Sequence, residues 1–490
     1  MLHPAHAQTL TAQLADRFAE RIRDRLLAPG TRLPSVRQCA AQQGVSPSTV
    51  VAAYDQLLAH GLVEARRNRG FFVRDWATNR PLALVQQAPP AISSIALIDV
   101  ADARRERAPI SAATLMRGMF SSDHAGKPQP GLGVLPPDWL DNDFMASALR
   151  RATTGTGLRD STVRYGDPQG DAELRRVLAA RLVQQGIDAA PTQIVTTVGA
   201  TQALDIVSRT LLKPGDTVMV EEPGWSVEFA RLGALGMRML PVPRHADGPD
   251  LAVMARYCEA HAGTPQAPRL FVSVSVLHNP TGYCLSAASA HRLLQLAQQH
   301  DFHIVEDDTY HHLAPEHATR LAQLDGLSRT IYVSGFAKIL APAWRVGFLA
   351  APPALVEPLL DTKLLATLTT PTLLERALAQ VIDQGQLRRH AERVRTRLDA
   401  ARSRSVKLAE QHGCRFATPP AGLFGWVDTG VDTDQLALRL LDDGYLLAPG
   451  ALFHATRAPS TLMRINFAST QEPAFWRTFT RARQAMLNIK

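Results

Sequence analysis

The chain has 490 residues, of which 46% are apolar and 20% charged, so it can form two or three compact units and is not disordered by composition. Its net charge of +8 favours an anionic partner, and no apolar run approaches the roughly 20 residues of a membrane-spanning helix. The first residues lack the basic opening and apolar core of a secretory signal. We therefore expect a cytoplasmic globular protein without membrane contact.

The spacing of cysteines and histidines argues against a disulfide framework and a metal site. The four cysteines are far apart in sequence: Cys39, Cys258, Cys284 and Cys414. A loose group of histidines follows one predicted strand: His303, His311, His312 and His317. Neither set has the spacing of a known metal site, so we expect reduced thiols, solvated or pocket-lining histidines and no bound metal.

The first 76 residues predict a helix-turn-helix. They contain ten arginines and six acidic residues, which is half of the net charge of the chain. Apolar residues spaced four apart predict an amphipathic helix over 9–28. Ser35 can cap a second helix over 36–43, and Ser46 can cap a third that begins at Pro47 and runs to about residue 60.

A basic β-hairpin follows these helices. Residues 62–65 and 70–74 predict two short strands around a tip that contains Arg66, Arg67 and Arg69. Three helices and a basic wing together predict a winged helix-turn-helix, mostly α with a small β wing, over residues 1–76. Prolines and fading periodicity then predict a linker over 77–120.

Residues 121–490 predict a large α/β domain. Short apolar runs alternate with segments of helical length, which is typical of a parallel sheet covered on both faces. The ligands of such sheets bind where the strands reach their carboxyl ends. The residues that follow the predicted strands are therefore the candidates for a functional site.

Lys338 comes directly after the predicted strand 331–333 and lies among apolar neighbours. Only six of the 53 basic residues are lysine, and the others are arginine. Lysine is the cation that can lose its proton and form an imine with an aldehyde. Taken alone, Lys338 is equally compatible with a lysine that extends to solvent over an apolar surface.

Three polar residues follow two other predicted strands. Asp307 ends the strand 302–306, Tyr310 lies three residues later, and Asn279 belongs to the motif His-Asn-Pro-Thr-Gly at 278–282. A buried carboxylate can keep a pyridine nitrogen protonated, and a tyrosine hydroxyl can bond a phenolic oxygen. Trp225, after a further strand, could stack on the same ring or belong to the core.

A glycine turn before a predicted helix gives a candidate phosphate site. Gly199 separates the strand 194–198 from a helix that begins near residue 202. The backbone N–H groups of Ala200 and Thr201 and the Thr201 hydroxyl would therefore face a ligand bound at the N-terminus of that helix. Arg345 and Ser334 could complete the contacts with a dianion.

In this order, the elements resemble the fold-type I aminotransferases that use pyridoxal 5′-phosphate (PLP), with matches from residue 165 to 464. The resemblance implies that Lys338 forms the Schiff base with PLP, that Asp307 pairs with the pyridine nitrogen, and that Asn279 and Tyr310 contact the phenolic oxygen. It also implies ring stacking by Trp225 and phosphate contacts from Ala200, Thr201, Ser334 and Arg345. Tyr165 would reach the phosphate of the opposite subunit, and Arg464 would bind the carboxylate of the ligand.

Two departures from that family affect the phosphate site. Many relatives have hydroxyl residues where this chain has Gly335 and Ala337, and a serine where it has Ala200. We therefore expect either a weaker hold on the phosphate or contacts from Ser334 and Thr201 in their place.

The first 76 residues resemble the GntR winged helix, through Leu-Pro-Ser-Val-Arg at 33–37, Val-Ser-Pro-Ser-Thr-Val at 45–50 and Gly-Phe-Phe-Val at 70–73. That family often has an arginine where this chain has Pro47, so base recognition must differ. The residues expected to contact double-stranded operator DNA, mostly through phosphate, are Arg37, Ser46, Ser48, Thr49, Arg66, Arg67 and Arg69.

A GntR domain linked to a PLP fold is the arrangement of the MocR-type transcriptional regulators. The resemblance implies a homodimer that binds DNA and responds to PLP or to a small amino compound bound to it. The alternative is an aminotransferase that turns over at Lys338 and carries an attached DNA-binding domain. Accumulation of product over many turnovers would distinguish the second from the first.

Overall fold

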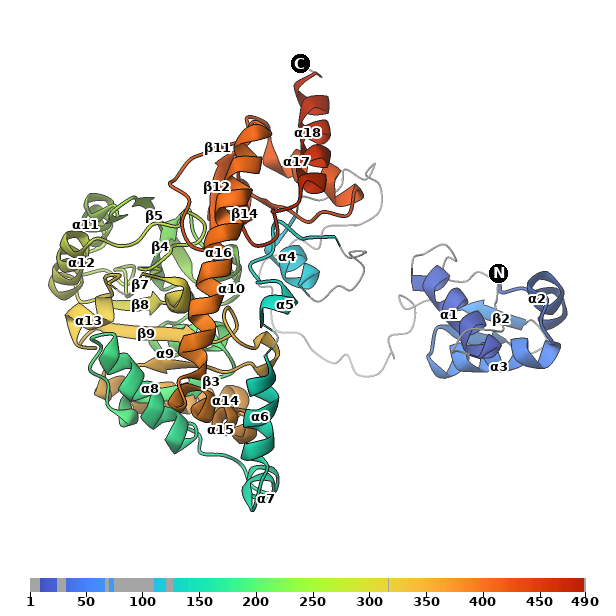
Figure 1. Ribbon diagram of the computed structural model, residues 1–490, viewed down its shortest axis with the longest axis horizontal. Coiled ribbons are helices and arrows are strands. Elements are labelled where there is room, and N and C mark those ends of the chain that lie inside the picture. The colour runs from blue at the N-terminus through green and yellow to red at the C-terminus, as the bar shows by residue number, and fades with distance from the viewer. Residues whose placement is uncertain are drawn as a thin grey trace, which may run out of the picture. The chain divides into compact units, whose positions relative to one another are not determined.

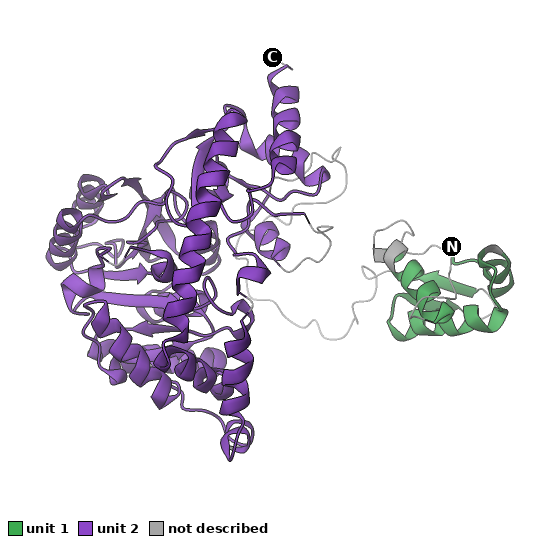
Figure 2. Cartoon of the chain, viewed as in Figure 1, with its two compact units in different colours: residues 1–102 green, residues 103–490 purple. Residues whose placement is uncertain are grey.

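The computed structural model divides the chain into two compact units, residues 1–102 and 103–490, shown in Figure 2. It describes residues 9–23, 32–66, 70–74, 110–119, 127–140, 142–315 and 317–488. None of the helices in these ranges is both long and apolar enough to cross a membrane.

The described part of the first unit has the predicted winged helix-turn-helix. Its elements are α1 (Leu10–Arg23), α2 (Val36–Gln43), α3 (Pro47–Ala59), β1 (Val63–Arg66) and β2 (Gly70–Val73). The side chain of Ser35 accepts a hydrogen bond from the backbone of Gln38 and caps α2, while Gly44 ends α2 with φ 67°. A buried core of α1 and α3 side chains around Tyr54 fixes the angle between the helices.

The second unit contains a large mixed sheet in the order β3-β10-β9-β8-β7-β4-β5-β6 (Figure 1). Its strands are β3 (Ile194–Thr197), β4 (Thr217–Glu222), β5 (Arg238–His245), β6 (Gly248–Pro249), β7 (Leu270–Ser273), β8 (His303–Asp307), β9 (Thr330–Gly335) and β10 (Gly347–Ala350). The centre, from β9 to β5, is parallel.

The expected parallel sheet forms the centre, whereas β10 and the short edge strand β6 are antiparallel to their neighbours. Strand β10 runs antiparallel to both β9 and β3. Only residues 336–346 join β9 to β10, and they contain no crossover α-helix, only the short 3₁₀ turn Pro342–Trp344. A parallel neighbour requires a crossover of a dozen or more residues, so this short connection returns the chain in the opposite direction.

Helices cover both faces of the large sheet. On one face, α9 (Ala200–Leu211), α10 (Ser226–Ala234) and α14 (Pro353–Thr367) pack on side chains such as Val333. The other face carries α8 (Ala172–Gln184), α11 (Leu251–Ala260), α12 (Ala287–Gln299), α13 (Leu321–Asp325), α15 (Thr372–Asp383) and α16 (Gln386–Gln411). The carboxyl ends of the central strands, which carry the candidate site, therefore lie between these two layers of helices.

A smaller antiparallel sheet follows in the order β11-β12-β14-β13. Its strands are β11 (Arg415–Phe416), β12 (Phe424–Asp428), β13 (Ala448–Pro449) and β14 (Leu462–Asn466), and the adjoining helices are α17 (Thr433–Asp442) and α18 (Pro473–Leu487). Before the large sheet come α5 (Pro137–Leu140), α6 (Asp143–Ala152) and α7 (Gly157–Thr162).

Helix α4 (Ala112–Gly118) falls inside the segment predicted as linker, 77–120. Ser111 caps it, and Ile110 and Leu115 are buried in the main core of the second unit. A Cβ on Gly118 would lie 2.2 Å from a methyl group of Leu446, so the helix packs closely on that unit. The last part of the segment, from Ile110 onward, therefore belongs to the second unit.

Candidate functional site

The amine of Lys338 lies shortly after β9 and meets a distant backbone segment. Its Nζ donates a hydrogen bond to the carbonyl oxygen of Gly133 at 2.7 Å. Burial and, to a smaller extent, the charges of Arg464 and Arg345 lower the pKa of Lys338 to about 8, whereas Asp307 opposes this shift. A large fraction of this amine is therefore neutral and nucleophilic near pH 8.

Asp307 ends β8, and only one oxygen of its carboxylate accepts a hydrogen bond from the described residues. The backbone N–H of Thr309 donates to Oδ1 at 3.1 Å, and the Thr309 hydroxyl donates to the same oxygen. None of the described residues donates to Oδ2. Burial raises the pKa of Asp307 to about 6, although the Thr309 hydrogen bonds oppose this shift. A cationic N–H donor at Oδ2 would stabilise the ionised carboxylate.

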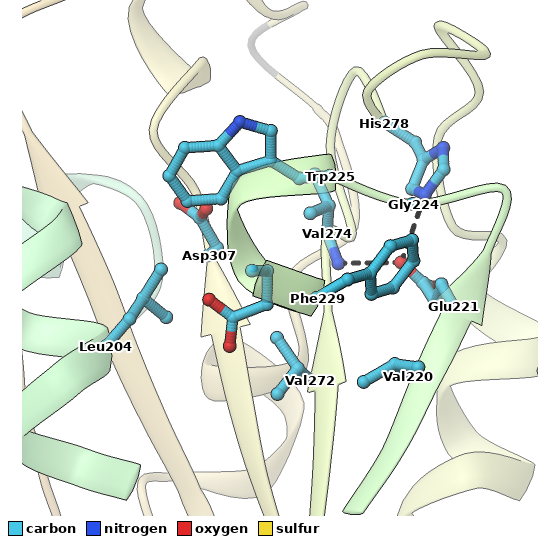
Figure 3. A pocket seen from close by; sticks show the side chains of 11 residues that line it. Leu204, Val220, Glu221, Gly224, Trp225, Phe229, Val272, Val274, His278 and Asp307 are labelled. Atoms are coloured by element: carbon cyan, nitrogen blue, oxygen red, sulfur yellow. Dashed lines mark hydrogen bonds and ion pairs between the residues drawn. The ribbon is translucent and has the colours of Figure 1, made fainter. Parts of the chain in front are cut away.

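Asp307 and Trp225 line the same pocket. Figure 3 shows the indole of Trp225, at the start of α10, beside the carboxylate of Asp307 at the strand ends. The other lining residues are Leu204, Val220, Glu221, Gly224, Glu228, Phe229, Val272, Val274 and His278. The structure thus places a flat aromatic side chain next to the carboxylate, as a stacked ring would require.

Arg464, on β14, is buried, and one of its nitrogens has no partner among the residues that the structure describes. Its Nη1 donates to Oδ1 of Asn279 at 2.9 Å, and Nη2 donates to the carbonyl oxygen of Gly131 at 2.6 Å. Nε is buried and has no acceptor among the described residues. A buried guanidinium with a free donor and no carboxylate partner in that part of the chain has the chemistry of an anion site.

Two phenyl rings fix the plane of this guanidinium. Its central carbon lies 4.2 Å from the ring centroid of Phe424 and 5.1 Å from that of Phe453. Burial lowers the pKa of Arg464 to about 10, and Tyr310 partly opposes this shift. Tyr310 packs edge-on against Phe424, with ring centroids 5.6 Å apart. The predicted residues Tyr310, Asn279 and Arg464 therefore lie together.

The N-terminus of α9 is brought against Arg345. Nη2 of Arg345 donates to the carbonyl oxygen of Val198 at 3.0 Å, and a Cβ on Gly199 would lie 2.5 Å from that nitrogen. Gly199 has φ 80°, which a residue with a side chain rarely adopts. The first N–H groups of α9, at Ala200 and Thr201, have no partner within the helix. Together with Arg345 they can bind a phosphate dianion.

Ser334 does not join this group. Its buried hydroxyl donates to the carbonyl oxygen of Asp308 at 3.0 Å and lies 2.9 Å from Nδ1 of His311. Its strand neighbour Val333 packs with α9, and successive side chains of a strand point to opposite faces. The structure therefore directs Ser334 away from the predicted phosphate contact. His311 is itself buried behind the site, contrary to the prediction of a solvated or pocket-lining residue.

Tyr165 is the predicted site residue that stands apart. It lies between α7 and α8, and 84% of its surface is exposed. Other exposed apolar residues lie on α7 or directly after it, Leu158 and Val163, and at the end of α14, Leu365 and Leu368. Lys363 on α14 donates to the carbonyl oxygen of Pro168 at 2.5 Å, which joins the two segments that carry these residues.

Several residues of the site gave no recognisable signal in the sequence. The segment 127–136 contributes the carbonyl oxygens of Gly131 and Gly133, and Asn466 holds that segment through Leu132 at 2.9 Å and Val134 at 2.7 Å. Phe424 and Phe453 resembled ordinary core residues, and Thr309 an ordinary turn residue. The spacing of Gly131 and Gly133 was the one feature that could have suggested a close backbone approach.

The first unit gathers hydroxyl groups at the start of α3. Oγ of Ser46 accepts from the Thr49 backbone at 3.2 Å and lies 2.8 Å from the hydroxyls of both Ser48 and Thr49. Ser46 and Ser48 are exposed, and Pro47 is the first helical residue. This end of α3 can therefore contact DNA through hydroxyl and backbone groups.

The described arginines in and near the wing and on α2 differ in the contacts that their side chains make. Arg66 pairs with Glu64 at 2.7 Å and lies 4.5 Å from the Phe72 ring centroid. Arg32, which the sequence analysis did not select, is exposed, and its Nε lies 3.3 Å from the position of a Cβ on Gly70. Arg37 on α2 is also exposed. Arg67 and Arg69 lie outside the described residues.

Family comparisons agree with this division. Residues 137–474 match the model of the class I and II aminotransferases, and residues 10–73 match that of the gntR family of bacterial regulatory proteins. Both matches lie within the two units defined by the fold.

Individual relatives include regulators and enzymes. The probable rhizopine catabolism regulatory protein MocR of Rhizobium meliloti is 30% identical, covering 87% of this chain and 82% of its own. The HTH-type transcriptional regulator TauR of Rhodobacter capsulatus is 29% identical, covering 92% and 91%. Among solved structures, the α-aminoadipate aminotransferase LysN of Thermus thermophilus superimposes with a TM-score of 0.69 at 25% identity, covering 77% of this chain and 96% of that one.

Proposed function

From the premise that the chain belongs to the MocR-type transcriptional regulators, which join a GntR domain to an aminotransferase domain, we propose that its second unit holds PLP and responds to a small amino compound. The DNA-binding unit and the aminotransferase fold are properties of the family. The cofactor, the effector and the assembly of two subunits are the proposed parts.

One observation carries the cofactor proposal. Two polar atoms lack partners among the described residues, Oδ2 of Asp307 and Nε of Arg464, and both side chains influence the pKa of Lys338. The pyridinium N–H of PLP can donate to Asp307. The carboxylate of an amino acid attached to PLP can accept from Arg464. These residues therefore fit the cofactor.

Each remaining side chain has a distinct task in this proposal. Lys338 would condense with the aldehyde carbon and release water, Trp225 would stack on the ring, and Asn279 and Tyr310 would bind the phenolic oxygen. Ala200 and Thr201 would bind the phosphate through backbone N–H groups, with Arg345 supplying charge. When bound, PLP withdraws electrons from an attached amine, and Asp307 sustains this by keeping the ring nitrogen protonated.

We further propose a homodimer that covers the apolar residues around Tyr165. Exposed apolar surface of this kind is unusual on a monomer, and Leu365 is 93% exposed. A second copy of the chain is the expected occupant because Tyr165 of another subunit could bring a hydroxyl to the phosphate, where Ser334 does not reach.

The decisive experiment titrates the purified protein with PLP and reduces it with borohydride. Labelled peptide containing Lys338 is expected, and the loaded protein should change its DNA affinity when a suitable amine is added. Labelling of another lysine would refute the site assignment.

The alternative, a working aminotransferase, is favoured by the joint presence of Lys338, Asp307, Asn279 and Arg464. Product measured over many turnovers with an amine and a keto acid tests it. A single equivalent of product with an accompanying change in DNA affinity favours the regulator.

A further inference from the structure

A buried charged cluster lies beside the site and is not used by the proposed function. Glu221 lies near the end of β4, Arg244 lies on β5, and His278 follows β7. Nη1 of Arg244 is 2.5 Å from Oε1 of Glu221, and Nε2 of His278 is 3.3 Å from Oε2. The Arg244 side chain is 0% exposed and that of Glu221 is 3% exposed.

Arg244 keeps this carboxylate ionised. Burial opposes ionisation of Glu221, but Arg244 and His278 outweigh it and lower its pKa to about 2. Burial lowers the pKa of His278, so the imidazole is neutral and can donate through one nitrogen and accept through the other. Without Arg244, the cluster would contain a buried carboxylate with no cationic partner, which is strongly destabilising.

The ionised carboxylate organises the backbone after β7. Its Oε2 accepts from the N–H of Val274 at 2.9 Å, and Figure 3 shows both Val274 and His278 directed at Glu221. Nδ1 of His278 lies 2.9 Å from Oγ1 of Thr281. The cluster thus reaches from β5 across β4 to residues 278–282.

Those residues carry Asn279, whose Oδ1 accepts from Arg464. The carbonyl oxygen of Thr281 also accepts from the Thr418 hydroxyl at 2.7 Å, which ties residues 278–282 to the segment before β12. The turn that presents Asn279 is therefore held by Glu221 on one side and by Thr418 on the other.

We propose that Arg244 is a positioning residue of the ligand site: through Glu221 and His278 it fixes the turn 278–282 and so places Asn279 against Arg464 and the cofactor. Arg244 touches neither Asn279 nor Arg464 by any described contact. The inference rests on the proposed function because it assigns Asn279 a ligand to hold.

The test compares three variants with the unsubstituted protein. Arg244→Met leaves Glu221 unpaired, Arg244→Met with Glu221→Gln removes both charges, and Arg320→Met breaks another buried ion pair, with Asp308 at 2.6 Å, that does not contact the turn. Hydrogen exchange of peptides covering 274–285 is measured without PLP. PLP affinity and the pH midpoint of the PLP absorbance band are measured by titration, with Asn279→Ala as the reference.

Arg244→Met should speed exchange in 274–285, weaken PLP binding roughly tenfold and move the pH midpoint in the same direction as Asn279→Ala. The double variant should largely restore the exchange rate, the PLP affinity and the pH midpoint, because it leaves no unpaired buried charge. Arg320→Met should lower thermal stability without faster exchange in 274–285; it is the control for exchange alone, because its partner Asp308 influences the pKa of Asp307.

Unchanged exchange in 274–285, or faster exchange with unchanged PLP affinity and midpoint, would overturn the proposal. Failure of the unsubstituted protein to bind PLP would refute the proposed function instead, and the exchange data would still decide whether Arg244 holds the turn.

Discussion

The amine of Lys338 is hydrogen-bonded to the carbonyl oxygen of Gly133, 205 residues earlier in the chain. The same backbone segment accepts a hydrogen bond from Arg464 at Gly131. Two basic side chains of the site, Lys338 and Arg464, are therefore held by the segment 127–136, which precedes the entire large sheet in sequence. Their charges lie close enough that Arg464 lowers the pKa of Lys338.

The first prediction concerns the pH dependence of PLP attachment. Only the neutral amine attacks an aldehyde, so the rate should rise with pH through a midpoint near 8, the lowered pKa of Lys338. Asp307→Asn should move the midpoint down, because Asp307 raises this pKa, and Arg464→Met should move it up. Stopped-flow absorbance measures the rate. Lys338→Ala is the control without attachment, and a midpoint near 10.5 would contradict the burial of the amine.

Arg464→Lys should fail to replace the arginine. Lysine keeps the charge but cannot lie flat between Phe424 and Phe453 and donate from its edge to a carboxylate. The loss of a charged hydrogen bond costs about 1.5–3 kcal/mol, or roughly 10- to 100-fold in affinity. Spectral titration of the PLP-loaded protein with a panel of amino acids measures it. Matched amines without a carboxylate should bind the unsubstituted protein and Arg464→Lys with equal affinity. If amino acids and amines lose the same affinity in Arg464→Lys, the ligand carboxylate does not bind at Arg464.

The sequence was sufficient to locate side chains that directly follow a strand. Lys338, Asp307 and Asn279 each follow a buried strand, and the strand ends of a parallel sheet converge. It was insufficient where partners are remote: Gly131 meets Arg464 from 333 residues away, and nothing local marks that contact. Ser334 was misplaced because the choice between two faces of β9 depends on the register of the strand, which a motif does not fix.

Tyr165→Phe should weaken PLP retention without unfolding the chain. Removal of the hydroxyl takes away the proposed contact with the phosphate of the other subunit and leaves the exposed ring in place. Dialysis followed by absorbance measures retention, and light scattering measures the oligomeric state. A stable monomer that retains PLP normally would defeat both the dimer and the role of Tyr165.

Arg32→Ala should weaken DNA binding without regard to sequence. Arg32 is exposed, lies across Gly70 in the wing and has no acidic partner among the described residues. If it covers one phosphate, its loss should make the salt slope shallower by about one unit. Arg17→Ala is the matched control, because Arg17 donates to Gln43 at 3.0 Å within the same unit. Equal effects of the two substitutions would exclude a specific phosphate contact at Arg32.

The last prediction separates the wing from α3. Arg67 and Arg69 lie at the predicted wing tip, so replacing both with alanine should weaken binding to specific and random DNA alike and make the salt slope shallower by about one to two units. Thr49 lies in the first turn of α3, where Ser46 accepts a hydrogen bond from its backbone. Thr49→Ala should therefore cost more on the operator than on random DNA.

A salt-series titration of both variants against both DNAs measures the two effects. The backbone cap from Ser46 survives in Thr49→Ala, so its folding should be unchanged in circular dichroism. If the wing variant loses discrimination while keeping its salt slope, the wing contacts bases, and the assignment of base recognition to α3 is wrong. If neither variant changes DNA binding, the first unit does not bind DNA through this face, because both the predicted phosphate contacts and the predicted base contacts would then be missing.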